Sequence, residues 1–196
     1  KIEADNITIT VDGENSMTLK CKELVNSAGL GALSLAHSIL GLSKQYIPVT
    51  PTMYAKGNYF SLSGRSPFKH LIYPIPVPGG LGIHSTLDLN GETKFGPDVE
   101  WVDDPDYEVD PRRAEAFYRE IRCYWPNLPP KSLSPSYAGI RPKLGDPFTQ
   151  KYGKDFVIEG PKNHGINGLI NLFGIESPGL TASLAIADHV VLLLDQ

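Results

Sequence analysis

A short apolar run, a tight turn and a helical pattern near the C-terminus constrain this chain most. The run Leu169–Phe173 is typical of a buried strand. Beyond the turn, apolar residues recur at helical spacing at Leu180, Leu184, Ala187 and Val191. Ser177 suits an N-cap and Pro178 suits the first helical position. The pattern predicts a strand, a turn and a helix N-terminus whose free N–H groups attract negative charge, although an ordinary capped connection has the same pattern.

Composition excludes several classes of protein. The 196 residues are 41% hydrophobic and 20% charged, which predicts a globular chain of one domain or two small ones. The net charge is −4 and the longest basic cluster is Arg112-Arg113, so we expect no nucleic-acid surface. The longest apolar run, residues 190–194, is too short to span a membrane. Cys21 and Cys123 belong to no motif, which favours a reduced, cytoplasmic setting, with peripheral membrane association left open.

The rest of the chain reads as a mixture of helices and short strands. Asp12-Gly13 predicts a hairpin turn between two strands, and Asp110-Pro111 predicts the start of a helix that Pro126 ends. Between them, short runs broken by Pro and Gly predict a meandering antiparallel sheet. The expected strands are 7–11, 17–21, 23–26, 46–53, 58–62, 70–73, 81–87, 92–95, 138–141, 156–159 and 169–173, with helices at 31–40 and 111–125 and a Pro-rich linker at 128–135.

Three segments carry candidate chemistry. Residues 29–34 nearly match the dinucleotide-binding pattern of glycines, but Ser34 occupies the third small position and no acidic residue follows at the expected distance. His84 follows the run Leu81-Gly82-Ile83 and reads as either a sheet histidine or a proton acceptor. Arg141 ends a short apolar strand and is suited to bind a carboxylate or to form a surface ion pair. No spacing of ligand side chains predicts a metal site, and no G-x-S-x-G motif supports a hydrolase.

These segments, in this order, resemble the FAD-dependent oxidoreductases of the D-amino-acid-oxidase superfamily. The resemblance is greatest to the L-2-hydroxyglutarate dehydrogenases and oxidases within it. It rests on Leu24-Val25-Asn26-Ser27-Ala28-Gly29, Lys56-Gly57-Asn58-Tyr59, Leu71-Ile72-Tyr73-Pro74-Ile75-Pro76, Leu81-Gly82-Ile83-His84, Phe95-Gly96-Pro97, Ala138-Gly139-Ile140-Arg141-Pro142 and the long block from His164-Gly165 through Ile186.

The resemblance implies an α+β chain, α/β in the parent protein, with an antiparallel-sheet substrate domain and the closing segments of a Rossmann-like FAD-binding domain. Residues 1–30 would belong to the FAD-binding domain and 31–159 to the substrate domain, with a helix near 111–125. Residues 160–196 would supply the strand and helix that complete the FAD-binding domain. The family's N-terminal strand, G-x-G-x-x-G loop and acidic residue have no counterpart here. We therefore expect a C-terminal half that binds FAD weakly, or not at all, by itself.

The resemblance also implies site residues. FAD would contact two segments, whose members are Ser27, Ala28, Gly29, Gly174, Ile175, Glu176, Ser177, Gly179, Leu180 and Thr181. Arg141 would bind the substrate carboxylate, and Tyr73 and Tyr59 would line the substrate site. His84 is the candidate catalytic base, because an unperturbed histidine titrates near ~6.5.

The function implied is the oxidation of a small 2-hydroxy acid by hydride transfer to FAD, with oxygen or a quinone as the final electron acceptor. Two alternatives remain. The first is an oxidase of glycine or D-amino acids with the same fold, because an amine needs no strong base. The second is a domain fragment without cofactor or activity. Flavin colour distinguishes the fragment from the enzymes, and His84 variants distinguish the two enzymes from each other.

Overall fold

The computed structural model describes residues 1–2, 6–49, 51, 53–75, 82–145 and 155–195. The chain divides into two compact units. The first comprises Lys1–Pro51, Pro142–Asp146 and Gly153–Gln196, and the second comprises Thr52–Arg141 and Pro147–Tyr152. Residues 31–51 thus fall in the first unit, whereas the resemblance assigns them to the substrate domain.

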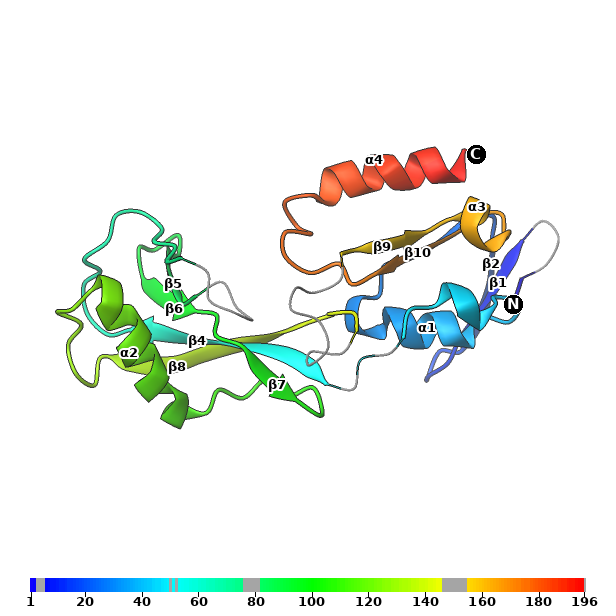
Figure 1. The fold of residues 1–196 in the computed structure, drawn as a ribbon. Coiled ribbons are helices and arrows are strands. Elements are labelled where there is room, and N and C mark those ends of the chain that lie inside the picture. Colours follow the sequence, from blue (N-terminus) through cyan, green and yellow to red (C-terminus); the bar gives the residue numbers. More distant parts are fainter. Residues whose placement is uncertain (3–5, 50, 52, 76–81, 146–154, 196) are drawn as a thin grey trace. The chain divides into compact units, whose positions relative to one another are not determined.

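The first unit is built on a three-stranded sheet in the order β3 (Leu24–Asn26), β10 (Leu169–Phe173), β9 (Val157–Glu159). Strand β10 pairs parallel with β3 and antiparallel with β9. All five residues of β10 are buried, because α1 (Ala32–Ser38) and α4 (Ser183–Leu194) both pack against it. Burial on two faces explains why four of its five residues are apolar, as is usual for a central parallel strand, and the strand expected there is confirmed (Figure 1).

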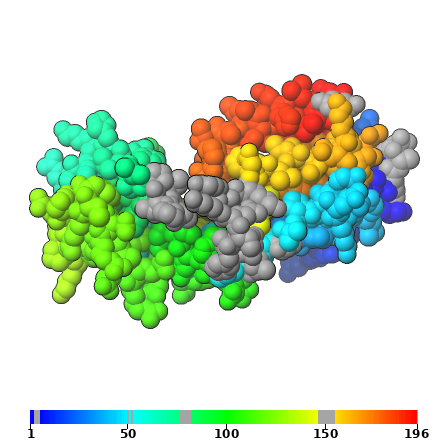
Figure 2. Space-filling model, in the orientation of Figure 1, coloured from blue at the N-terminus to red at the C-terminus, as the bar shows by residue number. Residues whose placement is uncertain are grey.

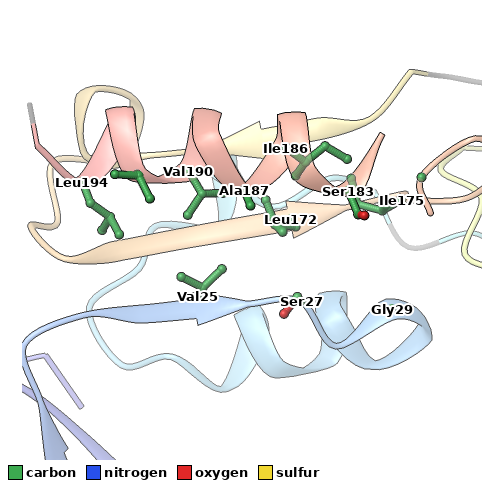
Figure 3. A pocket seen from close by; sticks show the side chains of 12 residues that line it. Val25, Ser27, Gly29, Leu172, Ile175, Ser183, Ile186, Ala187, Val190 and Leu194 are labelled. Carbon is green, nitrogen blue, oxygen red and sulfur yellow. The ribbon is translucent and has the colours of Figure 1, made fainter. Parts of the chain in front are cut away.

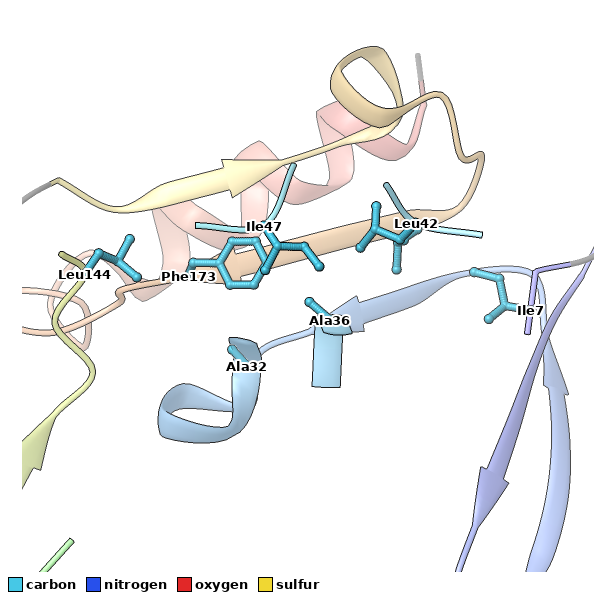
Figure 4. Close-up of a cluster of buried hydrophobic side chains, with 8 residues drawn as sticks. Ile7, Ala32, Ala36, Leu42, Ile47, Leu144 and Phe173 are labelled. Atoms are coloured by element: carbon cyan, nitrogen blue, oxygen red, sulfur yellow. The ribbon is translucent and has the colours of Figure 1, made fainter. Parts of the chain in front are cut away.

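The larger of the two buried clusters of this unit lies on the α1 side of the sheet. Ala32 and Ala36 pack there with side chains from the loops and from β10 (Figure 4). The members of this cluster are Ile7, Ala32, Ala36, Leu42, Ile47, Leu144, Leu169 and Phe173. The remaining elements are the antiparallel hairpin β1 (Ile7–Val11) and β2 (Met17–Cys21), the 3-10 turns η1 (Gly29–Gly31) and η2 (Lys44–Tyr46), and the short helix α3 (Pro161–His164).

The second unit is an antiparallel five-stranded sheet with a helix on one face. Its long central strand β4 (Tyr54–Leu62) pairs with β6 (Thr93–Gly96), β7 (Glu100–Val102) and β8 (Leu133–Arg141), and β5 (His84–Leu87) pairs with β6. Helix α2 (Ala114–Tyr124) follows the 3-10 turn η3 (Pro111–Arg113), and the Asp110 side chain accepts a hydrogen bond from the Arg112 backbone N–H as the expected N-cap. The core between α2 and the sheet contains Phe60, Ile83, Phe95, Phe117, Ile121, Leu128 and Leu133.

Several expectations were wrong. No strand forms over the described part of 46–53, where Pro48 and Pro51 cannot donate ladder hydrogen bonds. The expected linker 128–135 instead contains the start of β8, which tolerates Pro135 because it pairs only with β4 among the described strands and is irregular next to that residue. Helix α1 ends at Ser38 rather than residue 40, and Leu40, expected on its apolar face, is exposed. Strand β7 and helix α3 were not predicted.

Candidate functional site

Two parallel strands of the first unit end side by side, and the segments expected to contact a cofactor follow them. Residues 27–29 follow β3, and residues 174–181 follow β10. Asn26 and Asn171 join the two strands at this end: the Asn26 amide donates to Asn171 Oδ1 at 2.9 Å and to the Ala32 carbonyl oxygen at 2.9 Å. The carboxyl ends of parallel strands are a common place for ligands in α/β sheets.

A pocket of about 550 Å³ opens at this end of the strands and continues along α4. Figure 3 shows side chains of α4 on one side of it and Val25 and Ser27 on the other. Four of the residues expected to bind the cofactor line it: Ser27, Gly29, Ile175 and Gly179. Its other lining is mostly apolar, from Val25, Leu172, Ser183, Ile186, Ala187, Val190, Val191 and Leu194. Lining of this kind suits the burial of a flat, largely apolar ring.

A second hollow, of about 380 Å³, is lined by the turn itself. Its lining residues are Ile175, Glu176, Ser177, Pro178, Leu180 and Thr181. The turn is tight, because the Gly179 N–H donates to the Glu176 carbonyl oxygen and a Cβ on Gly179 would lie 2.5 Å from the Ile175 side chain. Ser177 and Leu180 are exposed, so this segment presents backbone and side-chain groups at the surface.

The turn is fixed to the rest of the first unit from one side. Gly174 has φ +70°, and a Cβ there would lie 2.7 Å from Leu144 Cγ, so the Leu144 side chain fills the space above this glycine. Lys143 donates to Glu176 Oε1 at 2.6 Å, and both side chains are largely buried. The residue pair 143–144 therefore holds the turn through one charge contact and one apolar contact.

The expected start of the last helix was wrong. We expected Ser177 as N-cap and Pro178 as the first helical residue, but α4 begins at Ser183 with Ala182 before it, and no side chain caps it. The intervening residues are taken up by successive turns, in which Ala182 N–H donates to the Pro178 carbonyl oxygen. The free N–H groups predicted for a helix end therefore belong to a series of turns.

The face of α4 that meets the sheet also differs from the expected one. Ile186, Val190 and Leu193 pack on the sheet, whereas Leu184 and Val191 of the expected face are exposed. Helix α4, red in Figure 2, thus exposes apolar side chains, and one of them, Val191, lines the pocket described above. The helix is apolar on more than one side, and the spacing of the four residues that we used did not identify the side that meets the sheet.

In the second unit, His84 lies on the sheet face that is opposite to α2. Ile83 packs into the core with Phe60 and Phe95, and the alternation of the strand turns His84 the other way. The His84 side chain is buried, and its ring centroid lies 4.1 Å from that of Tyr73. The expected orientation of His84, opposite to Ile83, is therefore what the structure shows. Part of the preceding segment, residues 76–81, lies outside the described residues.

Tyr59 lies on the same face, at the centre of a group of aromatic and cationic side chains. A Cβ at Gly96, which pairs with His84, would lie 2.7 Å from Tyr59 Cδ1, so the Tyr59 ring occupies the space above this glycine. The ring stacks on that of Tyr137, with centroids 4.4 Å apart. Burial raises the pKa of Tyr59, Tyr137 adds to the rise, and the Arg141 guanidinium opposes it.

Arg141 belongs to this face because β8 alternates. It pairs with Ala55, two positions before Gly57 and four before Tyr59, and Tyr137 lies four positions before it on β8. Three of the four substrate-side residues expected from the sequence, Tyr59, His84 and Arg141, thus share one face, and Tyr73 contacts it through His84.

Acidic side chains lie on the opposite face of the sheet. Glu100 pairs with Lys56, and Arg113 binds Asp98 at 2.5 Å and Glu100 at 3.5 Å. Buried Lys56 binds Asp106 at 2.6 Å. Among the described residues, Asp98 and Glu100 are therefore paired with a cation on the α2 side, whereas the cation Arg141 lies on the face of Tyr59.

Two members of this face were missed from the sequence, Tyr137 and Lys94. Lys94 pairs with Ser61 and Thr86 and its Nζ lies 5.6 Å from the centroid of the Tyr137 ring. Both could have been found from strand alternation: Tyr137 shares its parity with Arg141, and Lys94 is two residues from Gly96. Tyr137 was missed because we expected this strand to begin only at residue 138.

Comparison with solved structures identifies the class of fold. The chain matches the L-α-glycerophosphate oxidase of Mycoplasma pneumoniae, solved with FAD bound, at a TM-score of 0.77 and 23% identity, over 100% of this chain and 48% of that one. It also matches the glycine oxidase of Bacillus cereus at a TM-score of 0.63 and 16% identity, again over 48% of that chain. The chain therefore has the fold of about half of each of these two oxidases. The model of the family "FAD dependent oxidoreductase" (DAO) matches residues 1–193, and the chain belongs to this family.

Two curated relatives show which enzymes of this family the chain is similar to. The chain is 53% identical to the mitochondrial L-2-hydroxyglutarate dehydrogenase of Arabidopsis thaliana, over 91% of this chain and 39% of the relative. It is 29% identical to the glycerol 3-phosphate dehydrogenase of Caloramator mitchellensis, over 92% of this chain and 35% of the relative. The chain thus spans about two fifths or less of these relatives.

The comparison with the Arabidopsis relative corrects one expectation. We expected a cytoplasmic location from the cysteine content, but the Arabidopsis relative is named as a mitochondrial protein. Two reduced cysteines are compatible with several compartments and did not determine the location. Within the described part of the chain, no helix has both the length and the apolar character needed to cross a bilayer.

Proposed function

We propose that the protein of which this chain is a part oxidises a small 2-hydroxy acid, L-2-hydroxyglutarate or a close analogue, with FAD as its redox cofactor. The observation that carries the proposal is the shared face of Tyr59, His84 and the cationic Arg141 in the second unit. The 53% identity to a protein named L-2-hydroxyglutarate dehydrogenase supports the choice of substrate.

In the first unit, the ends of β3 and β10 provide the groups that would hold FAD. Gly29 has φ +57°, and no atom of the described residues lies within 4 Å of where a Cβ would be, so its backbone is open to a ligand on this side. The pocket beside it is large and apolar enough to accept part of a cofactor. Ser27, Ala28, Gly29 and the turn 174–181 would make these contacts. FAD, when bound, supplies the capacity to accept two electrons and a hydrogen from carbon.

In the second unit, two side chains would act on the substrate. Arg141 presents a planar guanidinium, which binds a carboxylate through two parallel hydrogen bonds and so fixes the orientation of the α-carbon. His84 would accept the proton of the 2-hydroxyl group at its imidazole, which favours departure of the hydrogen on the α-carbon. The Tyr73 ring packs against one side of the His84 ring. The rings of Tyr59 and Tyr137 stack on each other on the same face as Arg141.

The test uses the full-length protein loaded with FAD. We expect His84→Asn and His84→Ala to lower turnover of L-2-hydroxyglutarate by about 10²–10⁴, the usual contribution of a general base, and to remove the acidic limb of the pH–rate profile. The visible flavin spectrum should be nearly unchanged. The matched control is His70→Ala, because His70 is an exposed histidine of the same unit. Persistence of the acidic limb at similar turnover would place the base elsewhere.

The same experiment separates the competing substrates and electron acceptors. Glycine and D-alanine are assayed in parallel, and turnover of these amines that exceeds turnover of the hydroxy acid would favour the amino-acid oxidase. Oxygen consumption, measured with and without a soluble quinone, distinguishes the two acceptors that we propose.

A further inference from the structure

We propose that Lys94 binds a second carboxylate of the substrate, so that the second unit recognises dicarboxylic 2-hydroxy acids. This inference rests on the proposed function and extends it from one anchored carboxylate to two. The observation behind it is the placement of two cations, Arg141 and Lys94, beside one stacked pair of tyrosines.

Strand pairing puts Lys94 on the substrate face. Lys94 pairs with Ser61 on β4 and with Thr86 on β5, and these positions have the same parity as Tyr59 and His84. The neighbouring residue Phe95 points the other way, into the core under α2. The Lys94 side chain is partly buried, with 30% of its surface exposed.

The ammonium group of Lys94 retains capacity for a ligand. Its ion pair with Asp88 is loose, at 3.8 Å between Nζ and Oδ2, which is beyond hydrogen-bond distance. The other oxygen of Asp88 accepts the backbone N–H groups of Asn90 and Glu92 at 2.9 and 3.0 Å, so this carboxylate serves the β5–β6 turn. Asp98, Glu100 and Asp106 bind cations elsewhere, the first two on the α2 side of the sheet. A face with two cations and neutral rings between them attracts an anion with two charged ends.

The spacing suits a short dicarboxylate. Arg141 pairs with Ala55 and Lys94 with Ser61, six positions apart on β4, which is about 20 Å along a strand. Two long side chains that reach toward each other, with a five-carbon dicarboxylate between them, fill a span of this size. Lys94 does reach in this direction, because its Nζ lies over Tyr137, whose ring stacks on that of Tyr59. A monocarboxylate of equal length leaves the Lys94 end of the site without a partner.

The kinetic test compares L-2-hydroxyglutarate with L-2-hydroxyvalerate, which has the same carbon chain but no second carboxylate. In the full-length holoenzyme, Lys94→Met keeps the length of the side chain and removes its charge. We expect KM for L-2-hydroxyglutarate to rise about ten- to hundredfold, as for the loss of charge-assisted hydrogen bonds, and KM for L-2-hydroxyvalerate to change less than threefold. In Lys94→Arg, most of the wild-type difference in KM between the two substrates should return. The control is Lys69→Met, at an exposed lysine of the same unit.

A binding test separates failure of this inference from failure of the proposed function. Glutarate and valerate, which carry no hydroxyl group and cannot be oxidised, are titrated into the full-length protein by calorimetry. Glutarate bound at least tenfold more tightly than valerate, with this preference lost in Lys94→Met, supports the role of Lys94 even in a protein that does not oxidise L-2-hydroxyglutarate. Equal binding of the two acids, or a preference that survives in Lys94→Met, overturns it.

Discussion

Gly174 is the position at which the packing of the first unit is most sharply tested. Its φ of +70° belongs to the left-handed region, where an alanine costs about 1–2 kcal/mol. A Cβ would also lie 2.7 and 2.8 Å from two carbons of the buried Leu144 side chain, and overpacking of a core costs typically 1–3 kcal/mol. Gly174→Ala should therefore lower the free energy of unfolding by about 2–5 kcal/mol.

Gly165 provides the matched control for this change. Its φ is +75°, but no atom of the described part of the chain lies within 4 Å of where its Cβ would be. Gly165→Ala therefore carries the backbone cost alone, about 1–2 kcal/mol. Addition of Leu144→Ala should cost less in the Gly174→Ala background than in the wild type, because the truncation removes the overlap.

The assay is urea denaturation followed by far-UV circular dichroism. Tryptophan fluorescence serves as a separate reporter of the second unit, since both tryptophans, Trp101 and Trp125, lie there. Equal losses of stability in Gly174→Ala and Gly165→Ala would show that the Leu144 contact costs nothing and would refute the reasoning.

Two further outcomes are expected. Arg141→Lys in the full-length holoenzyme should raise KM for 2-hydroxy acids at least tenfold, because lysine keeps the charge but loses the two parallel hydrogen bonds, and should leave the FAD dissociation constant within about twofold; unchanged kinetics would remove Arg141 from the site. Burial raises the pKa of Glu159 above 4.5, and one of its oxygens is buried without a hydrogen-bond partner among the described residues. A raised native pKa gives stability that is present below pH 4.5 and lost as the pH rises through the native pKa. The free energy of unfolding of Glu159→Gln should therefore equal that of the wild type below pH 4.5 and exceed it at pH 7. A difference in unfolding free energy that does not change with pH would contradict this.

Local signals predicted the elements that depend on local chemistry. The hairpin around Asp12-Gly13, the helix opened by Asp110-Pro111 and the strand Leu169–Phe173 are all present, since turn, cap and run are each visible over a few residues. Strand β8 was only partly predicted, because Pro135 reads as a breaker and is tolerated only through the irregular pairing with β4. The predicted start of α4 was wrong: Ser177-Pro178 has the sequence of a helix start, but residues 177–182 form turns and α4 begins at Ser183.

The candidate site followed from the sequence to a similar extent. The orientation of His84 could be predicted, because alternation against Ile83 needs only one strand. The grouping of Tyr59, Tyr137, Lys94 and Arg141 depends on the register of three strands, and the sequence does not specify that register. The contact of Lys143 and Leu144 with the turn after β10 joins residues about 30 positions apart and has no local signal.

The pairing of β3 with β10 has a consequence for the order of folding. Asn26 and Asn171 are 145 positions apart, so β3 cannot pair with β10 until the residues between them have been synthesised. The described strands of the second unit all lie within residues 54–141, and once folded it holds Ala55 beside Arg141. This pairing shortens the loop between β3 and β10 to about 60 residues and lowers the entropy cost of its closure by about 0.8 kcal/mol. Pairing within the second unit thus assists assembly of the sheet of the first unit.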